Sequence, residues 1–534
     1  MAGIKSVSII LTAAVLIALL GGPALAQWGT DARIDTDTNG NTKAMTYVAR
    51  SGDNVYACWK DYRIDYNNGV IIANYSHDGG QTWGSQDQRV DTGKVGGSSI
   101  SNYPAIACSG DNVYVAWQDY RNDPGNSDLA NIYFNRSTDG GLSWEATDQR
   151  IDLGVPANDV MARNVDVAAY GSEVYILWED YRNGVSLPNA FFSMSDAYGA
   201  TGTWTAPVCV DYYGGQFYKQ AYPVMATVNN RIYIAWQDSR DADANVYMNH
   251  SFNGGRTWNS GDVRRVCTDY PAVGDSIYID IAATGAGGGG SGGGPFSTIR
   301  RNKGLSFSVS GPYGSTSPSP APNAGSKDRV YCFWRDYRNT QGPYMLDVYF
   351  NFSHDGGVTW GSQDQRINTN HPSPGTYWVG YPVVAASGKG VYLVWIDEKD
   401  DISPGTEPFI DDVYVNVSLL GGVIGTWSGP TRLDAGTAPG TVDCWHPNVT
   451  ASWPNVAVTW MDERDDQVSF YDTVYCAHST TAGYIWSADE RVDSGGSDTG
   501  AKYAEMHLAG NVLDVIYYDY RSAQRGVFYN SRSL

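Results

Sequence analysis

The strongest constraint on the fold is a short motif, Trp-x-Asp-Tyr-Arg, that occurs eight times along the chain in full or altered form. The first aromatic residues of successive copies lie 58, 61, 58, 98, 61, 65 and 57 residues apart. The copies occupy 58–63, 116–121, 177–182, 235–240, 333–338, 394–399, 459–464 and 516–521. A period of about 60 residues throughout the chain indicates a repeat architecture built from one kind of unit.

The second unit shows what each repeat contains. It has four short segments that alternate apolar and polar residues between turns of Gly, Asn and Asp, at 103–110, 112–119, 131–137 and 144–152. Such segments are typical of antiparallel strands. Four strands in each of eight units predict an all-β fold, an eight-bladed β-propeller with four-stranded antiparallel blades.

The ends of the chain predict how the ring closes. The last unit stops at "GVFYNSRSL" (526–534), before its fourth segment. The N-terminal sequence "WGTDARIDT" (28–36) matches that missing segment, as in "TDQRID" (147–152). We therefore expect the N-terminal strand to complete the last blade, which removes two exposed sheet edges.

The domain boundaries follow from two stretches outside the repeat. Residues 1–26 contain a lysine, a long apolar run and a small-residue site, which are typical of a secretory signal peptide. We therefore expect a secreted, extracellular propeller over 27–534 that has no membrane span after signal removal. Residues 286–327 are rich in Gly, Ser and Pro and explain the one long spacing, so we interpret them as an insertion.

The turn between the third and fourth segments is the most specific motif. It reads "SHDGGQTW" (76–83), "STDGGLSW" (137–144), "SFNGGRTW" (251–258) and "SHDGGVTW" (353–360). Its Asp or Asn can accept backbone N–H groups, and its glycines suit a tight hairpin. The pattern resembles the Asp-box, or BNR repeat, of sialidases and other propellers. The resemblance implies a sialidase-like propeller whose ligand site lies on the face away from these turns.

Strand direction places the Trp-x-Asp-Tyr-Arg loops on the face opposite the Asp-box turns. Eight similar copies around a ring cannot all meet one substrate, whereas catalysis needs unlike groups with different pKa values. We interpret the repeated motif as scaffolding, with contact to a ligand by a few copies as the alternative.

Residues that break the repeat near the channel mouth are the better candidates. Three carboxylates, Asp166, Asp280 and Glu505, align with positions that hold Pro in other units, and Tyr503 is near one of them. We take these four as the candidate catalytic residues, since carboxylates and a tyrosine could support glycosidic bond chemistry. The candidate ligand-binding residues are Arg163, Lys219, Trp378, Trp445 and His446. Local packing and electrostatic pairing are the alternatives for both sets.

Two functional classes follow. The resemblance implies a glycan-active enzyme in which a tyrosine activated by a glutamate attacks the substrate, and Tyr503 with Glu505 is the nearest match. The N-terminal Arg-Ile-Pro signature of sialidases is absent, and eight units differ from their six blades. The alternative is a non-catalytic extracellular binding or adhesion module that recognises a glycan or a protein.

The net charge of −21 limits the kinds of partner that the protein can bind. An acidic surface repels phosphate backbones, so nucleic acid is excluded and a glycan or glycoconjugate is expected, with an extracellular protein as the other candidate. No cofactor is expected. Ca²⁺ is the one ion that loops such as "DTDTNG" (35–40) would suit, although a simple turn explains that loop too. The seven cysteines lack metal-ligand spacing and are interpreted as buried thiols rather than a disulfide framework.

Overall fold

A computed structural model provides the structure of the protein. It describes residues 28–64, 68–93, 100–123, 129–156, 160–184, 186–213, 220–241, 243–258, 261, 263–268, 275–285, 328–340, 345–401, 410–465, 472–494, 500–519 and 525–534. The predicted signal peptide, Lys219 and the 286–327 insertion lie outside these residues.

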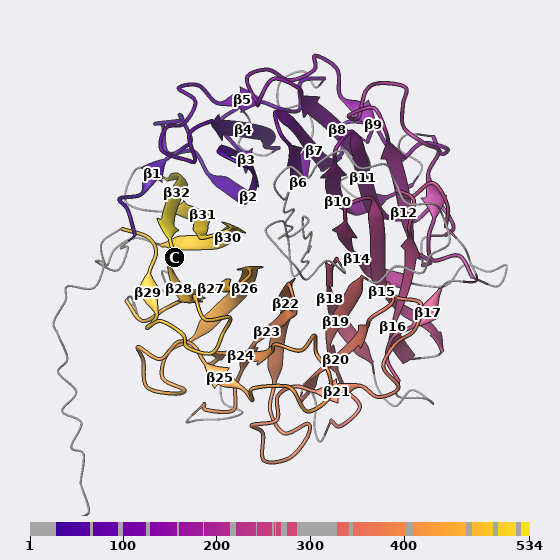
Figure 1. Cartoon of the computed structure of the whole chain (residues 1–534). Helices are drawn as coiled ribbons and strands as arrows, with labels where there is room; N and C mark the ends of the chain where they lie inside the picture. Colours follow the sequence, from indigo (N-terminus) through magenta and orange to yellow (C-terminus); the bar gives the residue numbers. More distant parts are fainter. Residues whose placement is uncertain are drawn as a thin grey trace, which may run out of the picture.

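The described residues form eight antiparallel four-stranded sheets arranged in a ring (Figure 1). Blade 1 contains β2 (Lys43–Ser51), β3 (Asn54–Asp61), β4 (Val70–Ser76) and β5 (Gln88–Arg89), and blade 2 contains β6 (Ser101–Ser109), β7 (Asn112–Asp119), β8 (Asn131–Ser137) and β9 (Gln149–Arg150). Blade 3 contains β10 (Ala162–Tyr170), β11 (Glu173–Asp180), β12 (Asn189–Ser195) and β13 (Val208–Cys209), and blade 4 contains β14 (Gln220–Val228), β15 (Arg231–Asp241), β16 (Asp243–Ser251) and β17 (Arg264–Arg265). Blade 5 contains β18 (Ser276–Thr284), β19 (Arg329–Asp336), β20 (Asp347–Ser353) and β21 (Gln365–Arg366), and blade 6 contains β22 (Val379–Ser387), β23 (Gly390–Asp397), β24 (Asp412–Ser418) and β25 (Thr431–Arg432). Blade 7 contains β26 (Cys444–Ser452), β27 (Asn455–Asp462), β28 (Thr473–Ser479) and β29 (Glu490–Arg491), and blade 8 contains β30 (Ala501–Ala509), β31 (Val512–Asp519), β32 (Gly526–Ser533) and β1 (Ala32–Arg33). The predicted eight-bladed propeller is confirmed.

The last blade is closed by the N-terminal strand, as predicted. β1 pairs with β32 in antiparallel register, with Ala32 opposite Tyr529 and Arg33 opposite Phe528. Asp35 then accepts the backbone N–H of Val527 at 2.8 Å. These contacts join residues almost 500 positions apart and hold the two ends of the ring together (Figure 1).

The core lies between neighbouring blades. One cluster joins Tyr47 and Cys58 of blade 1 to Ile106 and Trp117 of blade 2, and similar clusters fill the other junctions. The seven tryptophans of the Trp-x-Asp copies are all fully buried. Each blade therefore buries its apolar face against the next, which makes the ring the stable unit. None of the seven cysteines forms a disulfide.

The repeated motif forms one connected network, and blade 2 shows its geometry. Asp119 is fully buried and accepts the indole N–H of Trp117 at 2.8 Å and the backbone N–H of Arg121 at 2.8 Å. The Arg121 guanidinium pairs with Asp119 at 2.8 Å and with Asp148 at 2.7 Å, and lies 4.0 Å from the ring centre of Tyr133. Similar Trp–Asp–Arg contacts occur at Asp61, Asp180, Asp238, Asp336 and Asp462. The scaffolding interpretation is confirmed for these copies.

The turns that resemble the Asp-box share a second network. In blade 1, Ser76 Oγ donates to Asp78 at 2.8 Å and accepts the N–H of Gly80 at 2.8 Å, while Asp78 accepts the N–H of Thr82 at 2.8 Å. Gly80 has a φ of +89°, and a Cβ there would lie 2.1 Å from the Tyr529 hydroxyl of blade 8. Glycine is therefore required both for the turn and for contact with the neighbouring blade.

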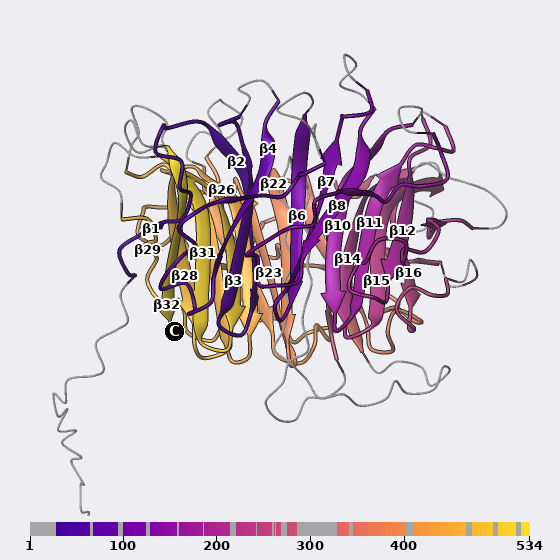
Figure 2. The same cartoon turned by 90° about the horizontal axis from the view of Figure 1, so that it is seen from above.

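The strands run between two faces of the ring (Figure 2). Because the strands of each blade alternate in direction, the Asp-box turns lie on one face. The loops after the second strand and before the first strand of each blade lie on the other, which we call the mouth face. No described segment is a helix long and apolar enough to cross a membrane.

The scaffold network predicts a stability effect. Asp119→Ala leaves the Arg121 guanidinium and the Trp117 indole without their buried partner, so we expect it to lower the free energy of unfolding by about 3–5 kcal/mol. Asp196→Ala is the control, because that side chain is 62% exposed. Urea titration followed by tryptophan fluorescence measures both, and equal losses for the two variants would contradict the scaffold role.

Candidate functional site

The innermost strand of each blade carries a bulge where it reaches the mouth face. In β6, Asn102 pairs with Gln118 and Ala105 with Ala116, so one residue is inserted between them, and the same shift occurs in all eight innermost strands. In blades 1 to 7 the third strand residue takes a positive φ between 47° and 57°. These residues are Met45, Tyr103, Asn164, Tyr222, Tyr278, Tyr381 and His446. Left-handed backbone at a bulky residue is strained and is characteristic of functional sites.

Four of the ligand-binding candidates lie at or beside this bulge. Trp445 and His446 are the second and third residues of β26 and are both half-buried. Arg163 is the second residue of β10, but it pairs with the buried Glu179 at 2.8 Å. Trp378 directly precedes β22 and is also half-buried. Their roles in binding stay predictions.

The predicted catalytic carboxylates occupy different surroundings from those expected. The register places Val165, Ile279 and Ala504, not the carboxylates, at the positions of the prolines. Asp166, Asp280 and Glu505 come one residue later, and each is at most 1% exposed.

The sequence alignment was thus wrong by one position. Because the same bulge occurs in every innermost strand, it leaves the units in register, and the three carboxylates align with Ala105 of blade 2 rather than with Pro104. They belong to blades 3, 5 and 8. Asp280 accepts the N–H of Ile281 at 3.0 Å and that of Val384 in blade 6 at 2.8 Å, which joins two blades. Tyr503 lies on β30, and its side chain is outside the described residues. The catalytic roles of these four residues stay predictions.

The structure brings aromatic side chains together along blades 4 to 7. The Tyr222 and Tyr278 rings stack with centres 6.4 Å apart, and Tyr222 is 42% exposed. The Tyr381 ring lies 6.4 Å from that of Trp378 and 5.1 Å from that of His446. We call these five residues the aromatic arc. Tyr222 is exposed and the other four rings are half-buried, and partly exposed aromatic rings suit the apolar faces of sugars.

The tryptophan of the arc depends on a glycine. A Cβ at Gly380 would lie 2.2 Å from the Trp378 ring, so only glycine leaves room for the ring beside β22. Gly380 takes the second position of its strand, where blade 7 has Trp445. The sequence therefore provides space for an aromatic ring over blade 6.

One cation lies within the arc. Arg335 occupies the variable position of its Trp-x-Asp motif and is 7% exposed. Its guanidinium lies 4.9 Å from the Tyr278 ring centre and 5.0 Å from that of Trp378. Burial lowers the pKa of Arg335. The charges of the neighbouring Tyr337, Tyr278, Tyr381 and Asp411 offset part of this lowering.

Two carboxyl groups border the arc on the side of blades 6 and 7. The N–H of Asp411 donates to Asp443 Oδ1 at 3.1 Å, and the N–H of Cys444 donates to the carbonyl of Asp411 at 3.0 Å. Asp411 is 3% exposed, and Asp443 is half-buried. Burial, and then repulsion from Asp443, raises the pKa of Asp411 well above its ordinary value. Burial also raises the pKa of Asp443 to about 8, and Glu463 contributes to the rise.

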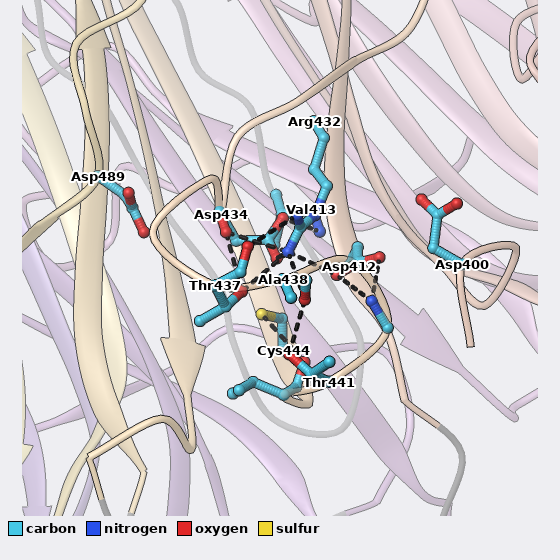
Figure 3. Close-up of polar contacts among 12 residues, drawn as sticks. Asp400, Asp412, Val413, Arg432, Asp434, Thr437, Ala438, Thr441, Cys444 and Asp489 are labelled. Atoms are coloured by element: carbon cyan, nitrogen blue, oxygen red, sulfur yellow. Dashed lines mark hydrogen bonds and ion pairs between the residues drawn. The ribbon is translucent and has the colours of Figure 1, made fainter. Parts of the chain in front are cut away.

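A third carboxyl group holds the loop that ends at Asp443 (Figure 3). Arg432 Nη2 lies 2.6 Å from Asp434 and 3.0 Å from Asp412, and also donates to Thr437 Oγ1 at 2.8 Å. The N–H of Gly440 donates to Asp412 at 3.1 Å. One arginine thus faces two buried aspartates. Burial, and then the charge of Asp434, raises the pKa of Asp412 to about 8, so the Asp412 carboxyl group holds its proton at neutral pH.

The raised pKa of Asp412 predicts a pH-dependent stability. Because the pKa of Asp412 is raised in the folded protein, stability is fully present below the ordinary carboxyl pKa and is lost as pH rises toward about 8. We expect Asp412→Asn to remove a slope of up to about 1.4 kcal/mol per pH unit between pH 5 and 8. Thermal unfolding at several pH values measures it.

Blade 2 provides the matched variant. There Asn131 stands where blade 6 has Asp412 and donates to Asp152 at 2.8 Å, so this position carries no ionisable group. Asn131→Asp should introduce the slope that Asp412→Asn removes. Identical pH dependence of wild type and Asp412→Asn would contradict the raised pKa of Asp412.

The acidic N-terminal loop is organised without a metal ion. Asp37 accepts Lys43 Nζ at 2.7 Å, the N–H of Asn39 at 3.1 Å and the amide of Asn41 at 3.0 Å. The ammonium group thus takes the place that a cation would need. Among the described residues, no group of three or more His, Cys, Asp or Glu side chains could hold a metal ion. Calcium binding stays a prediction.

Sequence reasoning missed the centre of this site for two reasons. Arg335 is inside the repeated motif, which was treated as uniform, although its middle residue differs in every pair of neighbouring blades. Asp411 and Asp443 come together only through the contact between two loops. The variable middle residue of Trp-x-Asp was the available signal.

Comparisons with known proteins were made for sequence and for fold. No family model and no curated protein matches the chain. Similar solved structures include the polysaccharide lyase Uly1, at 9% identity and a TM-score of 0.48, which covers 95% of this chain and 99% of that chain. The α-L-arabinofuranosidase Arb93A of Fusarium graminearum matches at 12% identity and 0.41, covering 95% and 98%. The Trypanosoma rangeli sialidase matches at 9% and 0.36, covering 94% and 59%. At this level of similarity the reaction must be argued from the site itself.

Proposed function

We propose that the protein is a glycan-active enzyme that cleaves a glycosidic bond at the mouth face, over blades 4 to 7. The observation that carries the proposal is the pair Asp411 and Asp443, two carboxyl groups with raised pKa values beside the aromatic arc. An acid that stays protonated near neutral pH is what glycosidic cleavage requires. Export from the cell, inferred from the N-terminal sequence, is part of the same proposal.

The chemistry assigns different roles to the two acids. Asp443 is the more accessible, so it donates its proton to the glycosidic oxygen as the bond from the anomeric carbon to that oxygen breaks. The carboxylate that forms then accepts a proton from the water that adds to the anomeric carbon. Asp411 acts as a positioning residue, since its N–H fixes Asp443 Oδ1. The arc orients the sugar by stacking.

Asp443→Asn tests the proposed acid. The amide oxygen can still accept the N–H of Asp411, but the side chain can no longer donate an acidic proton, so we expect kcat to fall about 10²–10⁴-fold with little change in KM. Wild-type activity should decline as pH rises through about 8, where Asp443 loses its proton. Release of reducing ends from a panel of polysaccharides measures turnover.

Asp275→Asn is the matched control. Asp275 accepts the N–H of Ala244 at 2.7 Å, as Asp443 accepts the N–H of Asp411. The Asp275 side chain is exposed, and the residue that donates to it is an alanine rather than a second aspartate. Its activity should stay within a factor of about three.

Two outcomes would contradict the proposal. Loss of turnover in Glu505→Gln but not in Asp443→Asn would move the reaction to blade 8 and favour the sialidase-like arrangement. Glycan binding without turnover of any substrate would favour the non-catalytic module.

Aromatic stacking makes a separate prediction. Gly380→Ala should displace the Trp378 ring, because a Cβ would overlap it. We expect Kd for the bound glycan to rise about 5–50-fold, with a smaller change in the melting temperature than Asp119→Ala produces. Calorimetric titration measures this, and unchanged affinity would exclude Trp378 from the binding surface.

A further inference from the structure

The middle residue of Trp-x-Asp lies at the mouth face in every blade and is charged in three of them. Lys60, Glu179 and Arg335 hold this position in blades 1, 3 and 5. All three residues are at most 7% exposed. A buried charge is costly unless it is paired or hydrogen-bonded, so each should have partners in the folded chain.

Two of these charges do have partners. Glu179 accepts hydrogen bonds from Arg163 at 2.8 Å, from Asn164 at 3.0 Å and from the Tyr181 hydroxyl at 2.7 Å. Lys60 Nζ donates to Asn102 Oδ1 at 3.2 Å.

Arg335 differs from both. Among the described residues it has no hydrogen-bond or ion-pair partner, and its Nε is buried without an acceptor. Its guanidinium lies against the Tyr278 and Trp378 rings, 4.9 and 5.0 Å from their centres. Rings of this kind restrict a guanidinium plane and leave its N–H edge to meet a planar anion in bidentate fashion.

We propose that Arg335 is an anion subsite and that the glycan bound at the aromatic arc is acidic, carrying carboxylate or sulfate groups. This inference rests on the proposed glycan function and specifies its substrate class. The missing partner of the guanidinium is then the anionic group of the ligand.

The surroundings suit this role in a chain with a net charge of −21. Asp411 is an acidic group whose charge acts on Arg335, and burial raises the pKa of Asp411 well above its ordinary value, which favours its protonated form. A protonated Asp411 neither pairs with the arginine nor repels an incoming anion. The acid proposed to position the catalytic group thus also keeps the arginine available.

The test compares Arg335→Met with Lys60→Met, which removes a buried cation from the equivalent position of the opposite blade. Binding is measured by calorimetry with oligogalacturonate as the carboxylate probe, a sulfated galacto-oligosaccharide as the sulfate probe, and neutral galacto-oligosaccharide as the reference. Wild type and Lys60→Met should bind at least one acidic probe about 10–100-fold more tightly than the neutral one, and Arg335→Met should lose this preference. The acidic probe that is preferred identifies the anionic group.

Stability provides the second readout. Arg335→Met removes an unpaired buried charge, so its melting temperature without ligand should equal or exceed that of wild type, whereas a structural arginine would leave a less stable protein. A lower melting temperature, or an acidic preference that survives in Arg335→Met, would overturn the anion subsite. Equal binding or turnover of neutral and acidic glycans would overturn it and leave the proposed function intact. Failure with every glycan would overturn both.

Discussion

The buried aspartate of the Trp-x-Asp motif is the interaction on which the rest of the structure depends. In blade 2, Asp119 binds the indole of Trp117, the backbone of the following loop and the guanidinium of Arg121. These bonds fix the tryptophan in the junction between blades and fix the loop that leaves the second strand. Similar bonds recur in blades 1, 3, 4, 5 and 7, so the loops that leave the second strands of these blades begin from defined positions.

The side chains at the mouth face differ from blade to blade, whereas the strands that carry them are arranged alike in all eight blades. In blades 1 to 7 the bulge gives one residue of the innermost strand a left-handed backbone, and the middle residue of Trp-x-Asp lies beside the bulge. The repeat determines the positions of these side chains, but the residue type at each position differs between blades. Blades 4 to 7 have aromatic rings, Arg335 and the two carboxyl groups with raised pKa values at or beside these positions.

Much of the fold could be predicted from the sequence because it depends on local patterns. Strand alternation and the Asp-box-like turns follow from residues near one another in the chain. The closure joins residues almost 500 positions apart, but the N-terminal segment could be recognised because it repeats the fourth segment of the other units. The eight blades and the closure by β1 were therefore correct. Trp378, Trp445 and His446 were found at the mouth because they interrupt the repeat.

The chemistry of the site was less predictable for physical reasons. Asp166, Asp280 and Glu505 come one residue after the mouth position that the alignment gave them, and a shift of one residue places a strand side chain on the other face, where these three are buried. The pKa values of Asp411 and Asp443 depend on burial and on a contact between two loops, and neither is visible in a local pattern. The sequence also could not show that Arg335 has no hydrogen-bond or ion-pair partner among the described residues.

The central claim is that the repeated parts are scaffold and that ligand recognition belongs to the departures on blades 4 to 7. Amide hydrogen exchange with and without an acidic oligosaccharide tests this most directly. The account predicts added protection in 372–381 and 410–446, which carry Trp378, Tyr381, Asp411 and Asp443. Protection confined to the Asp-box turns at 76–83 and 353–360, on the opposite face, would contradict it.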